Sequence, residues 1–439
     1  MKIAVIGLGF VGLSLATVLA SKNYNVIGVD TDIKKIQKIK NGRVPFCEPQ
    51  LQSILKSSLK KKLKISSDFK EIDYCDFIFI SVGTPQSKDG SIDLTNIKLV
   101  SKTIGKYLQN ASKKIQIIVK STVIPGTALK IIQILERTSG KKHGKDFDVI
   151  TNPEFLRESR AIEDTKKPHI IVLGAKDLKS LNKISKFYGK IHVHTPIIRT
   201  NNQTAEMIKY ANNAFLATKI SFINQIASIC EKIPGSNIED ISRAIGLDPR
   251  IGGQFLNAGP GYGGSCLPKD VRALINFSKD ANVEPVLLSA VDKTNKFQIK
   301  KILSKLKLDL GNLNDKQITV LGIAFKPNTD DIRDSVSITL INELLKNKAK
   351  VVVHDPMALD NTRRLFKNKI TYSSSVKNSL KNSDCGVIIT DWKEYRKISR
   401  NDVTEMKNKI IIDSRRMLKH IKSEVDYFAF GVGNEKFNC

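Results

Sequence analysis

The sequence predicts an α/β protein in which two doubly wound parallel-sheet domains are joined by a central helical domain with a long helix. Apolar strand-like runs alternate with helical patterns over the first 200 residues, and a similar alternation begins again near residue 317. Between them, apolar residues recur at helical spacing from about 202 to 232 with no intervening strand. We therefore expect three domains, at 1–200, 201–308 and 309–439.

Each expected strand is a short, mostly apolar run. In the first domain these runs are 2–8, 25–30, 76–83, 115–122, 148–152 and 169–174. In the last domain they are 317–325, 349–356, 385–392 and 409–415. The apolar positions that predict the long helix are Ile208, Ala211, Phe215, Phe222, Ile226 and Ile229, and further helices are expected over 237–246 and 286–306. Ligands should bind beyond the carboxyl ends of the strands and in the cleft between domains.

Length and composition favour some classes of protein over others. The chain has 439 residues, of which 41% are hydrophobic, so it can build two or three cores. It lacks a run of about 18 apolar residues, and we expect a cytoplasmic protein without a membrane partner. The formal charge of +29 comes from 72 basic against 43 acidic residues, spread along stretches such as 56–64 without interleaved aromatic residues. This pattern favours solvated helix faces and an anionic small substrate over a nucleic-acid partner.

The cysteines are scattered and include no CxxC pair. Their positions are Cys47, Cys75, Cys230, Cys266, Cys385 and Cys439. This spacing argues against disulfides and zinc, so we expect reduced thiols. His192 and His194 alternate on an expected strand without a third ligand, and no metal site is expected. Cys266 differs because it lies in 259-GPGYGGSCLPKD-270, where turn-forming and charged neighbours predict a loop. A reactive role and a structural role for this thiol are equally open.

A glycine-rich turn after the first strand predicts a dinucleotide site. Gly7 permits the tight turn, Gly9 allows close approach of a pyrophosphate, and Gly12 allows close helix packing, with the phosphates at the helix N-terminus. Asp30 closes the next strand 18 residues after Gly12, where its carboxylate would accept hydrogen bonds from both ribose hydroxyls. No arginine follows that would accommodate a 2′-phosphate. The sequence therefore predicts NAD rather than NADP, with a simple tight turn as the alternative.

Two strand ends and the segment after a third carry further polar residues. Thr84 and Thr122 could contact the cofactor or water, or could cap loops. Glu154 and Glu158 have the i,i+4 spacing of one helix face, where acid–base work and simple solvation are both open.

The long helix carries a polar set of its own. Glu206, Lys209 and Asn213 are spaced i, i+3 and i+7, so all three can project from one side. A salt-bridged helix surface is the alternative to a functional role.

Taken together, these motifs resemble the UDP-glucose and GDP-mannose dehydrogenase family of nucleotide-sugar 6-dehydrogenases. The resemblance covers essentially the whole chain and depends on seven motifs in family order. They lie at 7–12, 81–85, 121–127, 152–159, 206–213, 262–270 and 325–335. It implies a Rossmann-like NAD domain, a central helical domain at a homodimer interface, and a C-terminal nucleotide-sugar domain.

The resemblance also implies a reaction. Members of this family oxidise the sugar C6 alcohol to a carboxylate in two hydride transfers to NAD, and we expect UDP-glucose to give UDP-glucuronate for polysaccharide or glycan synthesis. Cys266 takes the position of the nucleophile that forms a thiohemiacetal and then a thioester. Lys209 and Asn213 take those of the groups that stabilise and orient the reacting oxygen. Asp270 is implied in proton handling, through Thr122 and a bound water, with the division of base chemistry among Lys209, Asp270 and water left open.

Contacts to the ligands are implied residue by residue. Those to NAD are Gly7, Gly9, Phe10, Val11, Gly12, Asp30, Lys35, Gly83, Thr84, Thr122 and Glu158, the last of which also lies near the catalytic group. Those to the nucleotide sugar are Glu154, Phe155, Leu156, Arg157, Lys209, Asn213, Arg250, Tyr262, Gly263, Lys269, Lys326 and Arg333. Arg250 resembles an arginine that reaches into the partner subunit's site, which implies shared active sites, and a surface-turn arginine is the alternative.

The substrate has alternatives. The stretch 245–261 resembles the UDP-glucose branch, whereas 152–162 and 265–274 also resemble the GDP-mannose branch. We give the first more weight because it is expected beside the sugar-nucleotide pocket. Ser265 stands where UDP-N-acetylmannosamine enzymes usually have a histidine, whereas Tyr262 and Leu267 stand where UDP-glucose enzymes commonly have phenylalanine. A non-catalytic sensor of nucleotide sugars is a different class, and it would be expected to lack the thiol or the lysine.

Overall fold

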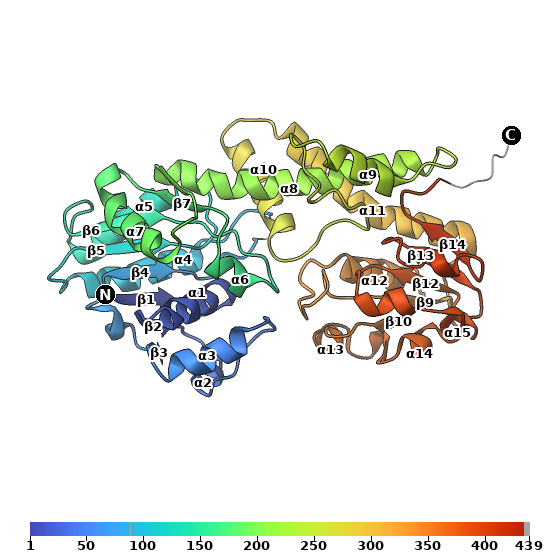
Figure 1. The fold of residues 1–439 in the computed structure, drawn as a ribbon, viewed down its shortest axis with the longest axis horizontal. Coiled ribbons are helices and arrows are strands. Elements are labelled where there is room, and N and C mark those ends of the chain that lie inside the picture. The colour runs from blue at the N-terminus through green and yellow to red at the C-terminus, as the bar shows by residue number, and fades with distance from the viewer. Residues whose placement is uncertain (88, 434–439) are drawn as a thin grey trace. The chain divides into compact units, whose positions relative to one another are not determined.

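The computed structural model describes residues 1–87 and 89–433, and Figure 1 traces the chain. The chain divides into two compact units, Met1–Asn212 and Asn213–Cys439. Each unit is described below by itself. Cys439, one of the expected reduced thiols, lies outside the described residues, whereas the five described cysteines form no disulfide.

An eight-stranded sheet forms the centre of the first unit, with the order β3-β2-β1-β4-β5-β6-β7-β8. Its strands are β1 (Lys2–Ile6), β2 (Asn25–Val29), β3 (Leu63–Ser66), β4 (Phe77–Ile80), β5 (Ile115–Val119), β6 (Phe147–Thr151), β7 (Ile171–Gly174) and β8 (Ile197–Thr200). Every pairing is parallel except that of β6 with β7, which is antiparallel at Thr151 and Gly174. Strands β4, β5 and β6 are buried at every position, as in a sheet that is covered on both faces.

The helices of this unit cover the sheet. They are α1 (Phe10–Ser21), α2 (Ile33–Lys40), α3 (Leu51–Leu59), α4 (Thr95–Leu108), α5 (Thr127–Ser139), α6 (Ala161–Lys166), α7 (Leu178–Ile191) and the first residues of α8 (Asn202–Cys230). Helix α1 packs against α3 and α6, and α4 packs against α5. From β1 the strand order runs one way to β2 and the other way to β4, and right-handed crossovers place the two groups of connecting helices on opposite faces. The carboxyl ends of β1 and β4 therefore border the point where the order reverses, which is where such sheets bind dinucleotides.

The second unit contains the rest of α8, three further helices and a smaller sheet (Figure 1). The helices are α9 (Ile238–Gly246), α10 (Leu267–Asp280) and α11 (Val286–Leu310). The sheet is parallel with the order β11-β10-β9-β12-β13-β14. Its strands are β9 (Gln317–Leu321), β10 (Lys350–His354), β11 (Thr371–Ser373), β12 (Cys385–Ile388), β13 (Ile410–Asp413) and β14 (Asp426–Ala429), and its helices are α12 (Val336–Lys346), α13 (Leu359–Phe366), α14 (Val376–Leu380) and α15 (Arg400–Val403).

The predicted fold class is confirmed, because two largely parallel sheets are present with helices between them in the sequence. The basic stretch 56–64 was expected to form a helix face throughout, but α3 ends at Leu59 and residues 63–64 begin β3. The expected strand at the two histidines is also wrong. His192 is the C-cap of α7, and His194 lies in the turn before β8.

The domain boundaries remain a prediction. Residue 200 closes β8, immediately before α8, whereas residue 308 falls inside α11. Ile302 and Leu306 of α11 belong to the same buried cluster as the second sheet, so this helix continues into the last predicted domain. Within residues 1–87 and 89–433, no helix combines the length and the apolar character that a membrane crossing requires.

Candidate functional site

The glycine turn after β1 has the geometry that the motif predicts. Gly7 has φ +89°, and a Cβ there would lie 2.8 Å from the carbonyl oxygen of Ser81. A Cβ at Gly12 would lie only 1.8 Å from the carbonyl oxygen of Gly7, so α1 approaches the turn too closely for a side chain. Gly9 faces open space and is the N-cap of α1, where no side chain accepts a hydrogen bond from the helix. The uncapped N–H groups of α1 and the space at Gly9 fit a pyrophosphate.

Asp30 lies beside this turn at the end of β2. Its Oδ2 accepts hydrogen bonds from Leu8 N at 2.7 Å and Lys35 Nζ at 2.9 Å, and its Oδ1 accepts one from Asp32 N at 2.9 Å. Burial raises the pKa of Asp30, but these hydrogen bonds outweigh it and hold the pKa below the usual range. Asp30 is thus an ionised carboxylate held in place beside the glycine turn, and the ammonium group of Lys35 lies next to it.

The loops after β4 and β5 form the adjoining part of this edge. Thr84 Oγ1 donates to the carbonyl oxygen of Thr122 at 2.8 Å, and Ser121 Oγ donates to that of Val82 at 2.7 Å. These bonds join the two loops. A Cβ at Gly83 would meet nothing within 4 Å, so the backbone there is accessible. The hydroxyl of Thr84 thus caps a loop, which is one of the two roles that the sequence analysis left open for it.

Residues 152–160 connect β6 to α6 without helical structure. The expected helix face shared by Glu154 and Glu158 is therefore wrong. Glu154 is buried. Its Oε1 lies 3.2 Å from Lys209 Nζ, and its Oε2 accepts a hydrogen bond from Leu156 N at 2.5 Å. The carboxylate thus fixes both its own loop and the lysine of α8.

Other predicted residues of this loop have separate partners. Lys209 Nζ lies 5.3 Å from the centre of the Phe155 ring, an attractive cation–π arrangement. Arg157 forms a double hydrogen bond with Asp164, at 3.0 Å from Nε and 2.6 Å from Nη2. Glu158 is half-buried. The structure therefore joins Glu154, Phe155 and Lys209, whereas Arg157 is directed to α6.

Lys120, at the end of β5, is a residue that the sequence analysis missed. Its Nζ donates to Asn152 Oδ1 at 3.2 Å. Desolvation lowers its pKa to about 8, Glu154 acts in the opposite direction, and Lys209 lowers the pKa further. A lysine next to a strand-end Ser-Thr pair carries no sequence signal of such an environment, because the partners come from two other segments.

In the second unit, Cys266 is the N-cap of α10 and is exposed. Its sulfur lies 3.7 Å from Ser265 Oγ. The expected loop position is correct up to the junction with the helix, where the helix dipole presents its positive end to the sulfur. Pro268, in the first turn of α10, fits there because that position needs no N–H donor.

Asp270 lies one turn along α10 from Cys266 and is almost completely buried. Its backbone N–H donates to the carbonyl oxygen of Cys266 at 2.9 Å. One carboxylate oxygen accepts a hydrogen bond from Asn213 Nδ2 at 2.6 Å, and the other accepts one from Lys269 Nζ at 2.6 Å. Four of the predicted site residues are thus brought together within this unit.

The glycines before Cys266 let this loop approach the last predicted motif. A Cβ at Gly263 would lie 2.4 Å from the carbonyl oxygen of Asp334. Gly264 has φ +86°, and a Cβ there would lie 2.7 Å from the Phe325 ring. Segments 262–270 and 325–335 are therefore packed together, as the prediction of one shared ligand requires. Within the second segment, the Lys326 Nζ lies 5.5 Å from the Phe325 ring centre.

Two arginines predicted to bind substrate form ion pairs on exposed turns. Arg333 binds Asp331, with Nε to Oδ2 at 2.8 Å. Arg250 binds Asp248, with Nη2 to Oδ2 at 2.6 Å, and its side chain is 87% exposed. Arg250 thus lies on an exposed turn of its own chain. An arginine that reaches into the site of a partner subunit would also be exposed in a single chain, so both interpretations of Arg250 are consistent with this position.

Three groups that hold the cysteine loop were missed. Asn295 of α11 accepts a hydrogen bond from Tyr262 N at 2.8 Å and donates one to the Tyr262 carbonyl oxygen at 2.9 Å. Asn224 of α8 accepts one from Gly259 N at 2.7 Å. Amides on long helices look like ordinary polar surface in a sequence, and only the fold reveals their backbone partners.

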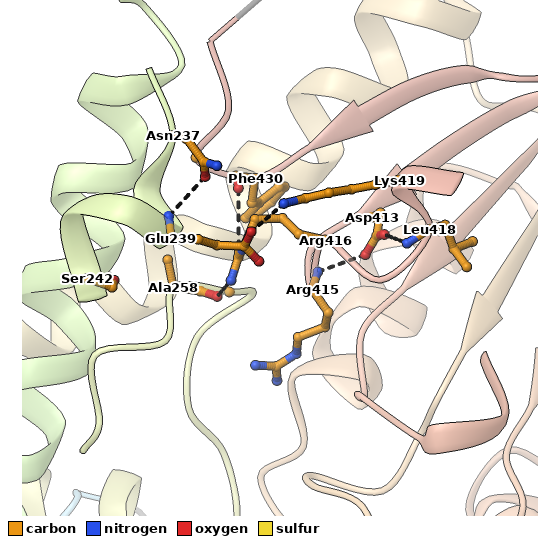
Figure 2. Close-up of polar contacts among 12 residues, drawn as sticks. Asn237, Glu239, Ser242, Ala258, Asp413, Arg415, Arg416, Leu418, Lys419 and Phe430 are labelled. Carbon is orange, nitrogen blue, oxygen red and sulfur yellow. Dashed lines mark hydrogen bonds and ion pairs between the residues drawn. The ribbon is translucent and has the colours of Figure 1, made fainter. Parts of the chain in front are cut away.

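The third group is Arg416, which follows β13 (Figure 2). It is buried, and its Nη2 donates to the carbonyl oxygen of Ala258 at 2.7 Å, while Nη1 donates to that of Phe430 at 3.2 Å. Its Nε lies 3.4 Å from Glu239, which also pairs with Lys419. Arg416 thus ties the start of the cysteine loop to the second sheet.

Models of a known protein family match three segments of the chain. Models of the UDP-glucose/GDP-mannose dehydrogenase family match residues 1–192 with its NAD binding domain, 203–297 with its central domain and 319–420 with its UDP binding domain. The chain belongs to this family. Its predicted class, an NAD-dependent nucleotide-sugar dehydrogenase, is thereby confirmed, as is NAD as the cofactor.

Individual relatives are similar over nearly their whole length. UDP-glucose 6-dehydrogenase TuaD of Bacillus subtilis is 41% identical over 95% of this chain and 89% of its own. UDP-glucose 6-dehydrogenase AglM of Haloferax volcanii is 38% identical over 97% and 99%. The solved structure of a UDP-glucose dehydrogenase from Pyrobaculum islandicum has a TM-score of 0.91 and 33% identity, covering 99% of this chain and 96% of that one.

Proposed function

We propose that this protein oxidises UDP-glucose at C6 to UDP-glucuronate, with two NAD reduced per product, through a covalent intermediate on Cys266. The observation that carries the proposal is the exposed thiol at the start of α10, one turn from a buried carboxylate held by Asn213 and Lys269. A family of nucleotide-sugar dehydrogenases needs such a nucleophile only if the aldehyde is oxidised further, because a free aldehyde has no second hydride to give without an added nucleophile.

The reaction balances as two oxidations and one hydrolysis. Loss of a hydride from C6 and a proton from its hydroxyl gives the aldehyde. The Cys266 thiolate adds to that carbon, and loss of the second hydride from the thiohemiacetal gives a thioester. Water then attacks the thioester carbon, and the C–S bond breaks to release the carboxylate and the thiol. When bound, NAD accepts the hydride in each oxidation.

The chain's own residues have separate parts in this scheme. Lys209, held by Glu154, supplies a positive charge that stabilises the substrate oxygen that becomes negative. Asn213 orients that reacting oxygen. Asp270 takes or delivers protons one turn from the thiol, together with water, and Thr122 and Glu158 are proposed to take part in the same proton handling. Gly9 and the N-terminus of α1 would hold the pyrophosphate of NAD, and Asp30 would accept hydrogen bonds from the hydroxyls of its ribose.

The decisive measurement is the stoichiometry of NADH and uronate. We expect about two NADH per acid in the wild type and nearly complete loss of acid formation in Cys266→Ala, with NAD binding retained. Cys75→Ala is the matched control, since that thiol is buried and should leave turnover unchanged. One NADH per turnover with release of aldehyde would overturn the covalent scheme.

UDP-glucose is preferred to GDP-mannose in this proposal because relatives such as TuaD and AglM, which are similar over nearly the full chain, are named UDP-glucose 6-dehydrogenases, and 319–420 matches a UDP binding domain. A pocket built for one ring and its hydrogen bonds rejects the larger guanine. We expect kcat/KM for UDP-glucose to exceed that for GDP-mannose by about a hundredfold or more. Faster NADH formation with GDP-mannose would reverse the assignment.

We also propose a homodimer with shared sites. Phe215, Phe222 and Ile229 on α8 are seven residues apart and are 65%, 52% and 48% exposed, a large apolar stripe for a helix surface. The stripe supports pairing with a second copy, and the exposed Arg250 is free of the buried contacts that would tie it to its own chain's core. Its place in the partner's sugar pocket is part of this proposal.

A further inference from the structure

Glu206 is a buried carboxylate on α8 that the proposed reaction does not use. It is 1% exposed, although its spacing with Lys209 and Asn213 also fitted a solvated helix surface. Its Oε2 accepts a hydrogen bond from Gly126 N at 2.7 Å, and its Oε1 accepts one from Ala128 N at 2.8 Å. These two donors belong to the N-terminus of α5, about 80 residues earlier in the chain.

The capping of α5 differs from that of two other helices of the same unit. Helices α2 and α7 are capped locally, by Asp32 accepting from Lys35 N and by Asp177 accepting from Ser180 N. The N-cap of α5 is Gly126, with φ +91° and no side chain. The helix therefore takes its cap from another element, and the carboxylate that satisfies its N–H groups also joins α5 to α8.

Both joined elements carry residues of the proposed mechanism. The loop 120–126 leads from β5 to the capped end of α5 and contains Thr122. Its other end is tied to the β4 loop by the bond from Thr84 to the Thr122 carbonyl. Lys209 lies three residues after Glu206, almost one helical turn, so it moves with Glu206 as one rigid segment.

We propose that Glu206 is a positioning residue, which sets the distance between the Thr122 loop and Lys209 by capping α5 from α8. This inference rests on the proposed function of those two residues. Two hydrogen bonds at 2.7 and 2.8 Å, one to each oxygen, fix the carboxyl group of Glu206 at the helix end, which a single contact or an apolar residue would not do. Displacement of a catalytic group by about 1 Å can lower a rate about a hundredfold.

The test compares Glu206→Ala, Glu206→Gln and Asp177→Ala. We expect Glu206→Ala to lower kcat for UDP-glucose about tenfold to a hundredfold, with KM for UDP-glucose changed less than about threefold. Glu206→Gln keeps one oxygen acceptor of the same reach and should recover part of the loss. Asp177→Ala removes a carboxylate cap from a helix of the same unit and should lower the melting temperature while leaving kcat unchanged.

Hydrogen exchange of the free protein separates this inference from the proposed function, because it needs no turnover. Faster exchange at residues 122–130 in Glu206→Ala, and not in Asp177→Ala, would support the positioning role even if the wild type failed to oxidise any nucleotide sugar. Unchanged exchange there would overturn it. So would a kcat that falls equally in Glu206→Ala and Asp177→Ala, since general destabilisation would then account for the loss.

Discussion

The chemistry of individual thiols separates Cys266 from the other described cysteines. Burial raises the pKa of Cys75 to about 11, and it also raises that of Cys385 above the usual range. Cys266 is exposed at a helix N-terminus. Its local sequence predicts the loop, because glycines precede the cysteine, but the sequence analysis did not predict the helix that begins at Leu267.

Asp30 is expected to control the choice of cofactor. Its carboxylate is ionised beside the glycine turn, so it would repel a 2′-phosphate, and NAD should be preferred to NADP. Asp30→Ala should lower the ratio of kcat/KM with NAD to kcat/KM with NADP. The affinity for NAD should also fall, because Leu8 N loses its hydrogen-bond acceptor. Asp32→Asn, two residues away, is the matched control and should leave the ratio unchanged. Equal use of both cofactors by the wild type would contradict the prediction.

The polar residues of α8 show what sequence alone leaves undecided at this scale. The helical spacing of Glu206, Lys209 and Asn213 places them on one side, but it does not say whether that side is solvated. All three are buried, at 1%, 4% and 5% exposure. Their partners, such as Glu154 and the N-terminus of α5, are 50 to 80 residues away in the chain, so no local pattern records them.

Among whole elements, position in the sheet decides which strands a sequence predicts. The apolar runs predict the ten inner strands, from β1 to β13, but not β3, β8, β11 and β14. These four are the edges of the two sheets. An edge strand pairs on one side only and buries fewer side chains, as the pattern of β8, with no buried residue, illustrates. The apolar run that marks an inner parallel strand is therefore missing.

The cap of α5 predicts a pH dependence of stability. Burial raises the pKa of Glu206 from 4.5 to about 7, against the effect of the backbone N–H donors at Ala128, Gly126 and Thr127. Because the folded value lies above the unfolded one, the native state binds the proton more tightly. The stability from this group is full below pH 4.5 and is lost as the pH rises to about 7, on the order of 3 kcal/mol at most.

Thermal unfolding of the wild type and Glu206→Gln between pH 4.5 and 8 measures this effect. The difference in Tm, wild type minus variant, should fall as the pH rises, because only the wild type loses the proton. Asp177→Asn is the control, because the pKa of Asp177 is shifted in the opposite direction. The hydrogen bond from Ser180 N lowers the pKa of Asp177, so this carboxylate stays ionised and its contribution to Tm should be constant over this pH range. A constant difference for Glu206→Gln would contradict the prediction.

Helix α11 is expected to hold the nucleophile's loop through one side chain. Asn295 binds both the N–H and the carbonyl of Tyr262, four residues before Cys266. Asn295→Ala should lower kcat about tenfold by letting the loop move, while NAD affinity stays unchanged. Thr294→Ala, the adjacent position on α11, is the control. Normal kcat in Asn295→Ala would mean that Asn224 and Arg416 suffice to fix the loop.

At the scale of the whole molecule, the long helix α8 carries a set of large apolar side chains that are exposed in the single chain. The stripe of Phe215, Phe222 and Ile229 has the seven-residue spacing of a helix that packs along a second helix. Sequence predicts the helix from these residues, but it cannot distinguish a stripe that covers its own core from one that covers another copy. In the structure the stripe is exposed, which makes the oligomeric state the property to measure.

A dimer with shared sites makes a prediction that no arrangement of separate sites makes. Arg250→Ala and Cys266→Ala should each be inactive alone, because each lacks one residue in every site. A mixed dimer would contain one site with both defects and one with neither, if Arg250 serves the partner. Random exchange gives about half mixed dimers and one intact site in each, so activity should return to about a quarter of the wild-type value. Subunit exchange is verified with two affinity tags. An inactive mixture despite exchange would place Arg250 in its own subunit's site, where its pairing with Asp248 would have to break before it could reach a ligand.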